Sequence, residues 1–501
     1  MSTRVYVRFL FLILLVCPLF IARSQQSPVR GLDEYIAKSM KQWDTPGLAI
    51  AIVKDDQVIF AKGYGMRKLG ESALVDEETI FACASTSKAM SVACLGMLVD
   101  EGKLKWDDPV EKYLPGFQLF DPYVTRELTV RDLLTHRSGL GRGDLLWYQS
   151  PYSREEILRR VRSLKPSSSF RSRYGYQNIM YMAAGEIVKS ISGKTWDEFI
   201  KERLFTPLGM TSSSTSVKDL AKATNVAAHH VEIDNEMVPI EWPNYDNVGA
   251  AGAINSSVLD LAQWVRLNLA WGTYNGKQIL STAVIKEMQT PQTVIRLDSL
   301  NTVIRPSTHF SMYGLGWNLR DYLGHKIVMH TGVLDGMRAR VSLIPELGVG
   351  FAILMNSPNE SLHEAIAYRL FDYYLGGPER DWSSELLKVI TDEKEKSKVD
   401  RKKKADERKK DTQPSLALDN YAGSYEHEMY GPATVAFEDG KLVLRFYPKY
   451  VGEMRHWNYD TFEVVWNDRN LGKEMVTFVL DSGGKVGSLR WEDVGEFRKK
   501  H

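Results

Sequence analysis

The stretch that decides the fold is "FACASTSKAM", residues 81–90, which continues as "SVACLGMLVD". A polar trio and a lysine stand here inside a run of small and apolar residues. One interpretation is that Ser85 caps a helix and that Lys88 reaches the surface. The other is that Ser85 is a nucleophile and that Lys88 helps to activate it. The rest of the chain has to decide between these two interpretations.

The spacing of Ser85 and Lys88 suits a nucleophile and its activator. Residues three apart share one face of a helix, and the sequence predicts a helix over 85–102. At a helix start, the backbone N–H of Ser85 has no intrahelical partner and could donate to an oxyanion. A half-buried ammonium at Lys88 would have a lowered pKa or would lower that of a neighbouring acid. The spacing alone is weak, because Ser482 and Lys485 repeat it in a predicted hairpin turn.

Length and composition limit the class of protein. A chain of 501 residues is too long for one ordinary core, so we expect two or more folding units. The net charge is only +1, so the chain has no overall electrostatic field that would attract nucleic acid or an anionic membrane. No Cys/His spacing predicts a zinc site and no phosphate loop is present, so we predict neither metal nor cofactor. Cys83 and Cys94 would lie about 16 Å apart on one helix, too far for a disulfide. The pair His229-His230 is expected in a loop.

The first residues have the pattern of a signal peptide. Arg4 and Arg8 precede the apolar stretch "FLFLILLVCPLFIA", and small residues at 22 and 24 favour cleavage before Gln25. A membrane span would need about 20 apolar residues, and Pro18 interrupts this stretch. We therefore predict a signal peptide over 1–24, export to the periplasm or medium, and no integral span after cleavage. A lipid anchor at Cys17 is the alternative.

The order of the predicted elements indicates an α/β (α+β) fold. A hairpin over 47–65 comes first, with Asp55-Asp56 as its turn. Helices fill the middle of the chain, and strands follow from about residue 312. This order predicts a mixed sheet whose first strand pairs with the last ones, with a helical subdomain inserted between. The middle helices are "LTVRDLLTHRSGL" ending at Gly139, "IMYMAAGEIVKSISG" ending at Gly193, and "DLAQWVRLNLAWG"; the late strands are "YGLGWNLR", "HKIVMHTG", "MRARVSLIP" and "VGFAILMN".

The C-terminal part changes character. Residues 388–410 mix both charge signs, which favours a solvated helical linker over a nucleic-acid patch. From Leu416 the chain alternates again, with three or four hairpins in about 85 residues, which predicts a small all-β module built as a partial or closed barrel. We therefore predict one large unit over 25–378, a charged linker over 379–415 and a small all-β domain over 416–501.

Two further motifs follow the first in order. "YGYQNIMYMAAGEIV" places Tyr176-Gln177-Asn178 at the head of a helix, and "VMHTGVLDG" places His330-Thr331-Gly332 at the end of a strand. The series Ser-x-x-Lys, Tyr-x-Asn and basic residue-Thr-Gly resembles the serine β-lactamase and penicillin-binding-protein family. Within it the series is similar to the branch of class C β-lactamases, D-alanyl-D-alanine carboxypeptidases, D-aminopeptidases and esterases. Flanks such as "KWDDPVEKYLPGF" and "YGLGW" extend the resemblance over about residues 30–375.

The resemblance implies a β-lactamase/transpeptidase-like fold and assigns catalytic roles. Ser85 would be acylated by a carbonyl substrate. Tyr176, with its pKa lowered by Lys88, would take the serine proton and later pass one to the leaving group. Whether Lys88 is itself the base stays open. A second Tyr-x-Asn begins at Tyr245, but no predicted helix holds it in place, so we prefer Tyr176.

The resemblance also assigns substrate contacts. Asn178 would hydrogen-bond the substrate and the lysine. Thr331 and Gly332 would form the strand edge along which the substrate lies. The N–H of Val333 would complete the oxyanion hole together with that of Ser85. The tail from residue 416 resembles a small C-terminal β domain that is lipocalin-like in some of these hydrolases.

His330 departs from the β-lactamase pattern, which has lysine there. Histidine is mostly neutral at pH 7, so it would anchor a substrate carboxylate less well, as in the D-peptidase and esterase members. Arg338 or Arg340 on the next strand could supply a charge to the cleft if it does not face solvent, and His136 is expected to be structural.

The predicted function is therefore an exported serine hydrolase that acts through an acyl-enzyme on a small peptide, amide or ester. The alternatives are a β-lactamase proper and a non-catalytic penicillin-binding or sensor-like protein. The expected partner is a small-molecule or peptide substrate and not nucleic acid, and a homo-oligomer is compatible with the sequence.

Overall fold

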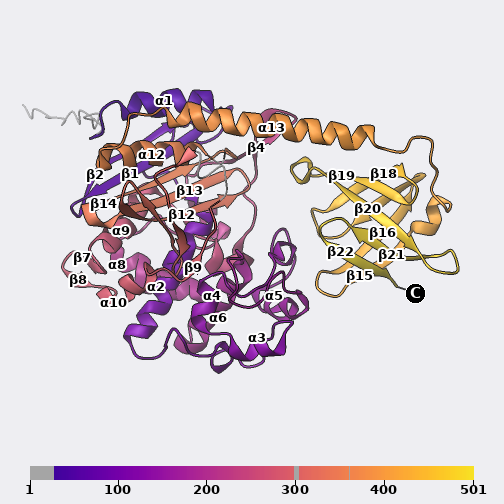
Figure 1. Ribbon diagram of the computed structural model, residues 1–501, viewed down its shortest axis with the longest axis horizontal. Coiled ribbons are helices and arrows are strands. Elements are labelled where there is room, and N and C mark those ends of the chain that lie inside the picture. The colour runs from indigo at the N-terminus through magenta and orange to yellow at the C-terminus, as the bar shows by residue number, and fades with distance from the viewer. Residues whose placement is uncertain (1–27, 298–303, 360, 501) are drawn as a thin grey trace, which may run out of the picture.

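The structure is a computed structural model that describes residues 28–297, 304–359 and 361–500. The predicted signal peptide over 1–24 lies outside the described residues. Figure 1 shows a large unit of sheet and helices, a long helix that leaves it, and a small β unit at the C-terminal end.

The large unit is built on one eight-stranded sheet. The predicted hairpin forms, since Asp55 and Asp56 both take positive φ in the turn between its two strands. The first strand also pairs with the last one of the unit, as predicted. Every pairing in the sheet is antiparallel, so the expectation of a mixed sheet is wrong, because short turns rather than crossover helices join the late strands. The order is β2 (Gln57–Gly65), β1 (Gly47–Lys54), β14 (Val349–Met355), β13 (Met337–Ile344), β12 (His325–Leu334), β11 (Asn318–Tyr322), β10 (Ser311–Tyr313) and β9 (Thr293–Val294).

Helices cover both faces of this sheet. In β1 the alternate residues Leu48, Ile50 and Ile52 pack in a core with α1 (Leu32–Gln42) and α12 (Leu362–Leu375). The intervening Ala49 and Ala51 pack in the core that holds α2 (Ser87–Asp100) and α9 (Val258–Leu269). A strand buried on both faces has a continuous apolar sequence, which explains "GLAIAIV".

The helical subdomain lies between the hairpin and the late strands. Helix α2 is buried on nearly all sides, as its small apolar sequence requires. Helix α6 (Asn178–Ser192) ends at Gly193 with φ 73°, as predicted. Helix α4 (Val130–Leu134) ends before the expected Gly139, because His136 takes φ 53° and turns the chain. The other elements are α3 (Pro122–Glu127), α5 (Arg154–Arg160), α7 (Trp196–Ile200), α8 (Thr206–Leu208), α10 (Thr282–Met288), β3 (Phe81–Ala82), β4 (His229–Ile233), β5 (Glu236–Ile240), β6 (Asn255–Ser256), β7 (Thr273–Tyr274) and β8 (Lys277–Gln278).

The histidine pair lies in a strand rather than in the expected loop. His229 and His230 begin β4 and are fully buried. His230 Nδ1 lies 3.1 Å from Asn356 O, and its Nε2 accepts from Leu69 N at 3.0 Å. The pair therefore ties the β4–β5 hairpin to neighbouring segments of the large unit.

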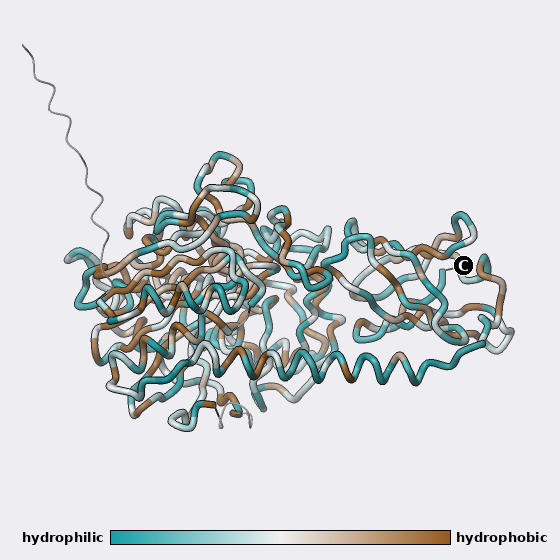
Figure 2. The backbone as a smooth tube through the Cα atoms, turned by 90° about the horizontal axis from the view of Figure 1, so that it is seen from above, coloured by the Kyte–Doolittle hydropathy of each residue, from teal (hydrophilic) through white to brown (hydrophobic). Residues whose placement is uncertain are grey.

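The charged segment forms one continuous helix, α13 (Trp382–Asp406). Only its first turns are buried, and Trp43 Nε1 donates to Ser383 Oγ at 3.0 Å to hold them against the large unit. The outer part is exposed and hydrophilic (Figure 2). The predicted helical linker thus has the expected secondary structure, while the domain limits at 378 and 416 stay predictions.

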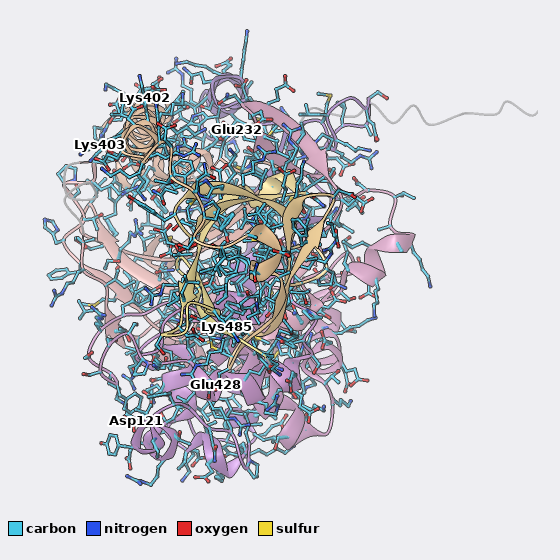
Figure 3. The ribbon with its side chains drawn as sticks, turned by 90° about the vertical axis from the view of Figure 1, so that its right-hand side faces the viewer. Asp121, Glu232, Lys402, Lys403, Glu428 and Lys485 are labelled. Atoms are coloured by element: carbon cyan, nitrogen blue, oxygen red, sulfur yellow. The ribbon has the colours of Figure 1, made fainter. Side chains whose placement is uncertain are left out.

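The C-terminal module is a closed eight-stranded barrel, one of the two architectures predicted for it. Its strands are antiparallel neighbours in chain order, as in up-and-down barrels. Figure 3 looks at this end of the molecule, where Glu428 lies in the β15–β16 turn and accepts from Ser163 Oγ at 2.9 Å. In the same turn Tyr430 O accepts from Tyr152 OH at 2.7 Å, so the barrel contacts the large unit beside α5. The strands are β15 (Gly423–His427), β16 (Gly431–Glu438), β17 (Lys441–Arg445), β18 (Val451–Asn458), β19 (Thr461–Trp466), β20 (Lys473–Leu480), β21 (Val486–Trp491) and β22 (Gly495–Lys499).

Candidate active site

Ser85 lies in a tight turn that leads into α2. The turn is a 3-10 helix over Ala84–Thr86, and Ala84 takes φ 48°, which is uncommon for a residue with a side chain. Thr86 Oγ1 donates to Cys83 O at 2.9 Å and holds the turn in shape. Ser85 is half-buried and lines a cavity of about 410 Å³. The predicted position at a helix start is therefore correct, and the serine faces open space.

Lys88 is fully buried beneath Ser85 rather than half-buried. Its Nζ lies 3.0 Å from Ser85 Oγ, 2.8 Å from Asn178 Oδ1 and 2.7 Å from Ala251 O. Burial, and secondly the Arg142 guanidinium, lower the pKa of Lys88 well below its usual value. In its neutral form a lysine amine has two N–H groups and one lone pair. The two N–H groups could donate to Asn178 Oδ1 and Ala251 O, and the lone pair could accept from the Ser85 hydroxyl. The Lys88 amine is therefore within hydrogen-bond distance of the Ser85 hydroxyl.

Tyr176 differs from its expected ionisation. Its ring centre lies 4.8 Å from Lys88 Nζ, but burial raises the phenol pKa above its usual value and the contact with Ser85 offsets only part of this. The expectation that Lys88 lowers the pKa of Tyr176 is therefore wrong, because burial has the largest effect on the phenol and raises its pKa. Tyr176 stays a neutral phenol, which suits a proton relay to the leaving group better than a first base.

Asn178 is oriented by a carboxylate that the sequence interpretation missed. Asn178 Nδ2 donates to Asp144 Oδ1 at 3.3 Å, so its Oδ1 turns toward Lys88. Trp147 Nε1 also donates to Asp144 Oδ1, at 2.8 Å, and Arg142 forms an ion pair with the other oxygen. The signal was the glycine-rich loop "GLGRGD", which follows the histidine of "LTHRSGL" and carries both charges.

The unpaired end of β12 forms one side of the cavity. Strand β11 pairs with β12 only as far as Met329, so among the described strands none pairs with that edge beyond it. Thr331 and Val333 line the cavity there, and Val333 is 51% exposed. The sequence prediction of a strand edge beside Ser85 is thus matched by the geometry.

Gly332 allows β12 to approach the nucleophile turn. A Cβ at this position would lie 2.2 Å from Cys83 O, a backbone atom that cannot move aside alone. We expect Gly332→Ala to displace the Ser85 turn and to slow covalent labelling of Ser85 about 100-fold, because an ångström of misplacement has an effect of that order. The matched control is Gly487→Ala in the barrel, where the nearest atom would lie at 3.7 Å. Equal labelling rates in the two variants would contradict this role.

His330 lines the cavity but does not present a free nitrogen to it. Its Nδ1 donates to Thr331 O at 2.7 Å, and its Nε2 accepts from Tyr313 OH at 2.9 Å. Burial lowers the pKa of His330 to about 3, so the ring is neutral. Both ring nitrogens of His330 are therefore engaged at the strand edge, while its assignment as a substrate-binding residue stays a prediction.

The remaining sequence candidates lie away from Ser85. Arg338 and Arg340 share a face of β13 as their alternation predicts, but both are buried and neither lines the Ser85 cavity. Tyr245 OH donates to Asp335 Oδ2 at 2.9 Å, outside the Ser85 and Lys88 contacts. The Ser482 motif lies in the β20–β21 turn, where Figure 3 shows Lys485.

His136 holds Tyr176 in place, in agreement with the structural role expected for it. Its Nδ1 accepts from Gln177 N at 3.0 Å, and its ring centre lies 4.2 Å from that of Tyr176.

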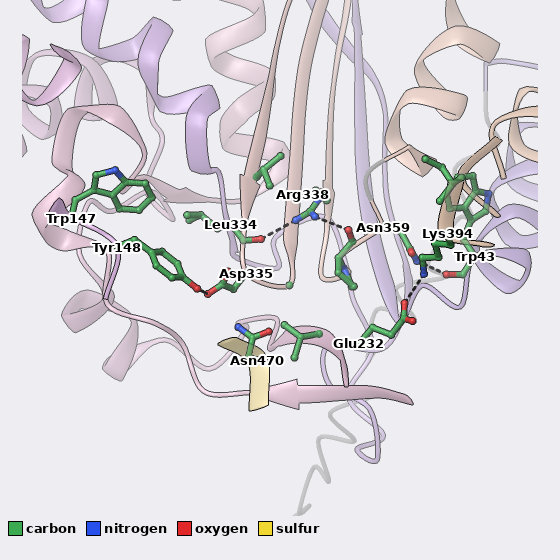
Figure 4. A pocket seen from close by; sticks show the side chains of 15 residues that line it. Trp43, Trp147, Tyr148, Glu232, Leu334, Asp335, Arg338, Asn359, Lys394 and Asn470 are labelled. Atoms are coloured by element: carbon green, nitrogen blue, oxygen red, sulfur yellow. Dashed lines mark hydrogen bonds and ion pairs between the residues drawn. The ribbon is translucent and has the colours of Figure 1, made fainter. Parts of the chain in front are cut away.

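A neighbouring cavity of about 510 Å³ extends the site toward α13 and the barrel (Figure 4). It shares Val333 and Leu334 with the Ser85 cavity. On its walls Tyr148 OH donates to Asp335 Oδ2 at 2.7 Å, and Lys394 forms an ion pair with Glu232. Two cavities therefore adjoin the end of β12 and share part of their lining.

Comparison with known proteins agrees with this geometry. The family model described as Beta-lactamase matches residues 32–374. The chain belongs to the β-lactamase family. A second model, Domain of unknown function (DUF3471), matches residues 407–500 of this β-lactamase-family protein, which include the barrel. The α/β (α+β) fold class, apart from the mixed sheet, and the family resemblance predicted from the sequence are thereby confirmed.

Several proteins are similar to this β-lactamase-family chain. An unguisins hydrolase of Aspergillus campestris is 29% identical over 435 residues, which cover 82% of this chain and 78% of the relative. Penicillin-binding protein 4 of Amycolatopsis lactamdurans is 27% identical over 322 residues, covering 62% and 81%. The octameric penicillin-binding protein homologue from Pyrococcus abyssi superposes with a TM-score of 0.62 at 25% identity, covering 93% and 99%.

Other site types are not supported within the described ranges. Over residues 28–297, 304–359 and 361–500, no three His, Cys, Asp or Glu side chains gather where they could hold a metal ion. In the same ranges no helix combines the length and apolar composition that crossing a membrane requires. Cys83 and Cys94 are buried free thiols, as predicted.

Proposed function

We propose that this β-lactamase-family protein is an exported serine hydrolase that forms an acyl-enzyme with small peptide, amide or ester substrates, of the D-amino-acid peptidase or esterase type. The observation that carries the proposal is the Lys88 amine, which lies 3.0 Å from Ser85 Oγ and contacts two oxygen acceptors.

The proposed reaction needs only groups at this site. Lys88 accepts the Ser85 hydroxyl proton while Oγ attacks the substrate carbonyl carbon. The oxyanion accepts hydrogen bonds from the N–H groups of Ser85 and Val333. Tyr176 protonates the leaving amine or alcohol and regains its proton from the Lys88 ammonium. Water then attacks the ester carbonyl with the same groups in reverse, which releases the acid and restores Ser85.

The substrate class follows from His330. In a β-lactamase of this branch, lysine at this position helps to hold the substrate carboxylate, whereas neutral His330 already spends both ring nitrogens on Tyr313 and Thr331. Because neither ring nitrogen is left to hold a substrate carboxylate, the histidine supports esters and amides over β-lactams as substrates. The name of the unguisins hydrolase supports hydrolysis as the reaction.

We expect the purified protein to turn over short-chain p-nitrophenyl esters or D-amino-acid amides with kcat/KM about 10- to 100-fold above that for nitrocefin. This ratio corresponds to the loss of one hydrogen bond to a charged group. Initial rates on a panel of these substrates in one buffer measure the ratio of the kcat/KM values. Nitrocefin hydrolysis that rivals the best ester would establish the β-lactamase alternative. Covalent labelling by penicillin without turnover of any substrate would establish the penicillin-binding or sensor alternative.

Export and oligomeric state remain proposals. Export is supported by the charged and apolar pattern of residues 1–24. A homo-oligomer is supported by the octameric state named for the Pyrococcus abyssi relative.

A further inference from the structure

The cavity of about 510 Å³ beside the Ser85 cavity is open to a ligand that is bound at Ser85. The two cavities share Trp147, Val333 and Leu334 in their linings. Asp144 holds the shared tryptophan in place, since its Oδ1 accepts from Trp147 Nε1 at 2.8 Å. A ligand at the nucleophile can therefore extend along one common wall into the neighbouring cavity.

The acyl part of a substrate is the part that would enter this neighbouring cavity. Tyr176, the group proposed to protonate the leaving amine or alcohol, lines the Ser85 cavity but not the neighbouring one. Its ring centre lies 6.5 Å from that of His330, which stands at the other end of the unpaired strand edge from Leu334. The leaving group therefore lies toward His330, and the acyl part runs toward Leu334.

Asp335 is the acidic group that the acyl part would meet. Its Oδ2 accepts from Tyr148 OH at 2.7 Å and from Tyr245 OH at 2.9 Å. Burial raises the pKa of both phenols above their usual value, so they stay neutral donors. No described residue donates to the Oδ1 of Asp335, and this residue lines the cavity. One carboxylate oxygen is thus left for a ligand.

The other polar groups near Asp335 do not pair with its charge. His229 Nδ1 contacts Asp335 O, and burial lowers the pKa of this histidine to about 4, so the ring is neutral. Both terminal nitrogens of Arg338 donate to backbone carbonyls. At the far wall Lys394 forms an ion pair with Glu232 (Figure 4). Among the described residues, no lysine or arginine is thus an ion-pair partner of Asp335.

The walls beside Asp335 are aromatic. The ring centres of Trp147 and Tyr148 lie 5.8 Å apart with their planes at 88°, and the ring of Tyr245 is stacked 6.4 Å from that of Tyr148. An ammonium group is attracted both by a carboxylate and by the faces of aromatic rings. A neutral polar group would gain only the weaker uncharged hydrogen bond. The chemistry of this end of the cavity therefore favours an ammonium group.

We propose that Asp335 binds an ammonium group on the acyl part of the substrate. The inference rests on the proposed function and names its substrate class, a peptide with a positive charge on the residue that precedes the acylated one. Asp335 follows Val333, whose N–H is assigned to the oxyanion hole, by two strand positions or about 7 Å. This is about the distance from a scissile carbonyl to the α-ammonium group of a dipeptidyl substrate. A basic side chain on the same residue would bring the same charge.

Binding is measured without turnover, on the Ser85→Ala protein, by calorimetry with two pairs of ligands. The first pair is glycyl-D-alanine amide and its N-acetyl derivative. The second pair is N-acetyl-L-lysyl-D-alanine amide and its norleucyl counterpart. We expect the charged member of at least one pair to bind about 10- to 100-fold more tightly than its neutral partner. A preference in the first pair identifies the α-amine as the ligand group, and a preference in the second identifies the side chain.

Asp335→Asn should remove this preference. Asparagine keeps an oxygen acceptor for the two phenols, so the fold should persist, and Asp335→Glu, which keeps the charge, should retain the preference. The matched control is Asp439→Asn in the exposed β16–β17 turn of the barrel, which should also retain it.

Equal affinities within both pairs would overturn the proposal without any variant at Asp335, and so would a preference that survives Asp335→Asn. These measurements use a protein without the nucleophile, so they are independent of catalysis. If the ester and amide panel shows no turnover while the preference for the charged ligand holds, only the hydrolase proposal fails. If the panel shows turnover while both pairs bind equally, only this inference fails.

Discussion

Lys88→Met is expected to lower the rate of Ser85 acylation by about 10⁴-fold, the upper range for a general base. Methionine has a similar length and tolerates burial, but it cannot accept a proton. Lys88 is fully buried and its amine lies 3.0 Å from Ser85 Oγ, whereas Tyr176, which also contacts Ser85, has a raised pKa. The burst of p-nitrophenol from an activated ester, followed by stopped flow, measures the acylation rate.

The control is Lys485→Met, which removes the lysine of the barrel motif and should leave the rate unchanged. The pH profile gives a second readout. Because the pKa of Lys88 is lowered, the amine is protonated and inactive only at pH values below that pKa, and the wild-type rate should rise with pH through it. Lys88→Met should lack this rise. A variant that keeps more than a tenth of the wild-type rate would show that Lys88 is not the base.

Ser85→Ala is expected to lower ester hydrolysis by about 10⁵- to 10⁶-fold, the loss typical of a removed serine nucleophile. The change deletes one atom at the cavity wall and leaves the carbonyl and amide contacts of Lys88 intact, so the fold should persist. Initial rates on the best ester of the panel measure it, with Ser482→Ala as the matched control. A loss of less than 100-fold would exclude Ser85 as the nucleophile.

Local sequence signals predicted much of the fold and part of the site. The hairpin of β1 and β2, the end of α6 at Gly193 and the closed barrel depend on alternation and on turn residues, which lie within a few positions of each other. The resemblance to the β-lactamase family also implied that Ser85 and Tyr176 come together at one site. The structure places both beside Lys88.

Burial and partner choice could not be predicted in this way. Alternation showed that Arg338 and Arg340 share a face, but not that α12 covers it. The role of His330 depends on Tyr313, which lies on a strand two places away in the sheet. The pKa directions of Lys88 and Tyr176 were likewise set by desolvation, a property of the packed fold rather than of spacing.

The central claim is that Ser85 is the residue that becomes acylated, and intact mass spectrometry after incubation with a fluorophosphonate tests it most directly. The protein as purified and its Ser482→Ala variant should each gain one adduct, and Ser85→Ala should gain none. Peptide mapping should place the adduct on Ser85. An adduct of the same mass and rate on Ser85→Ala would contradict the account.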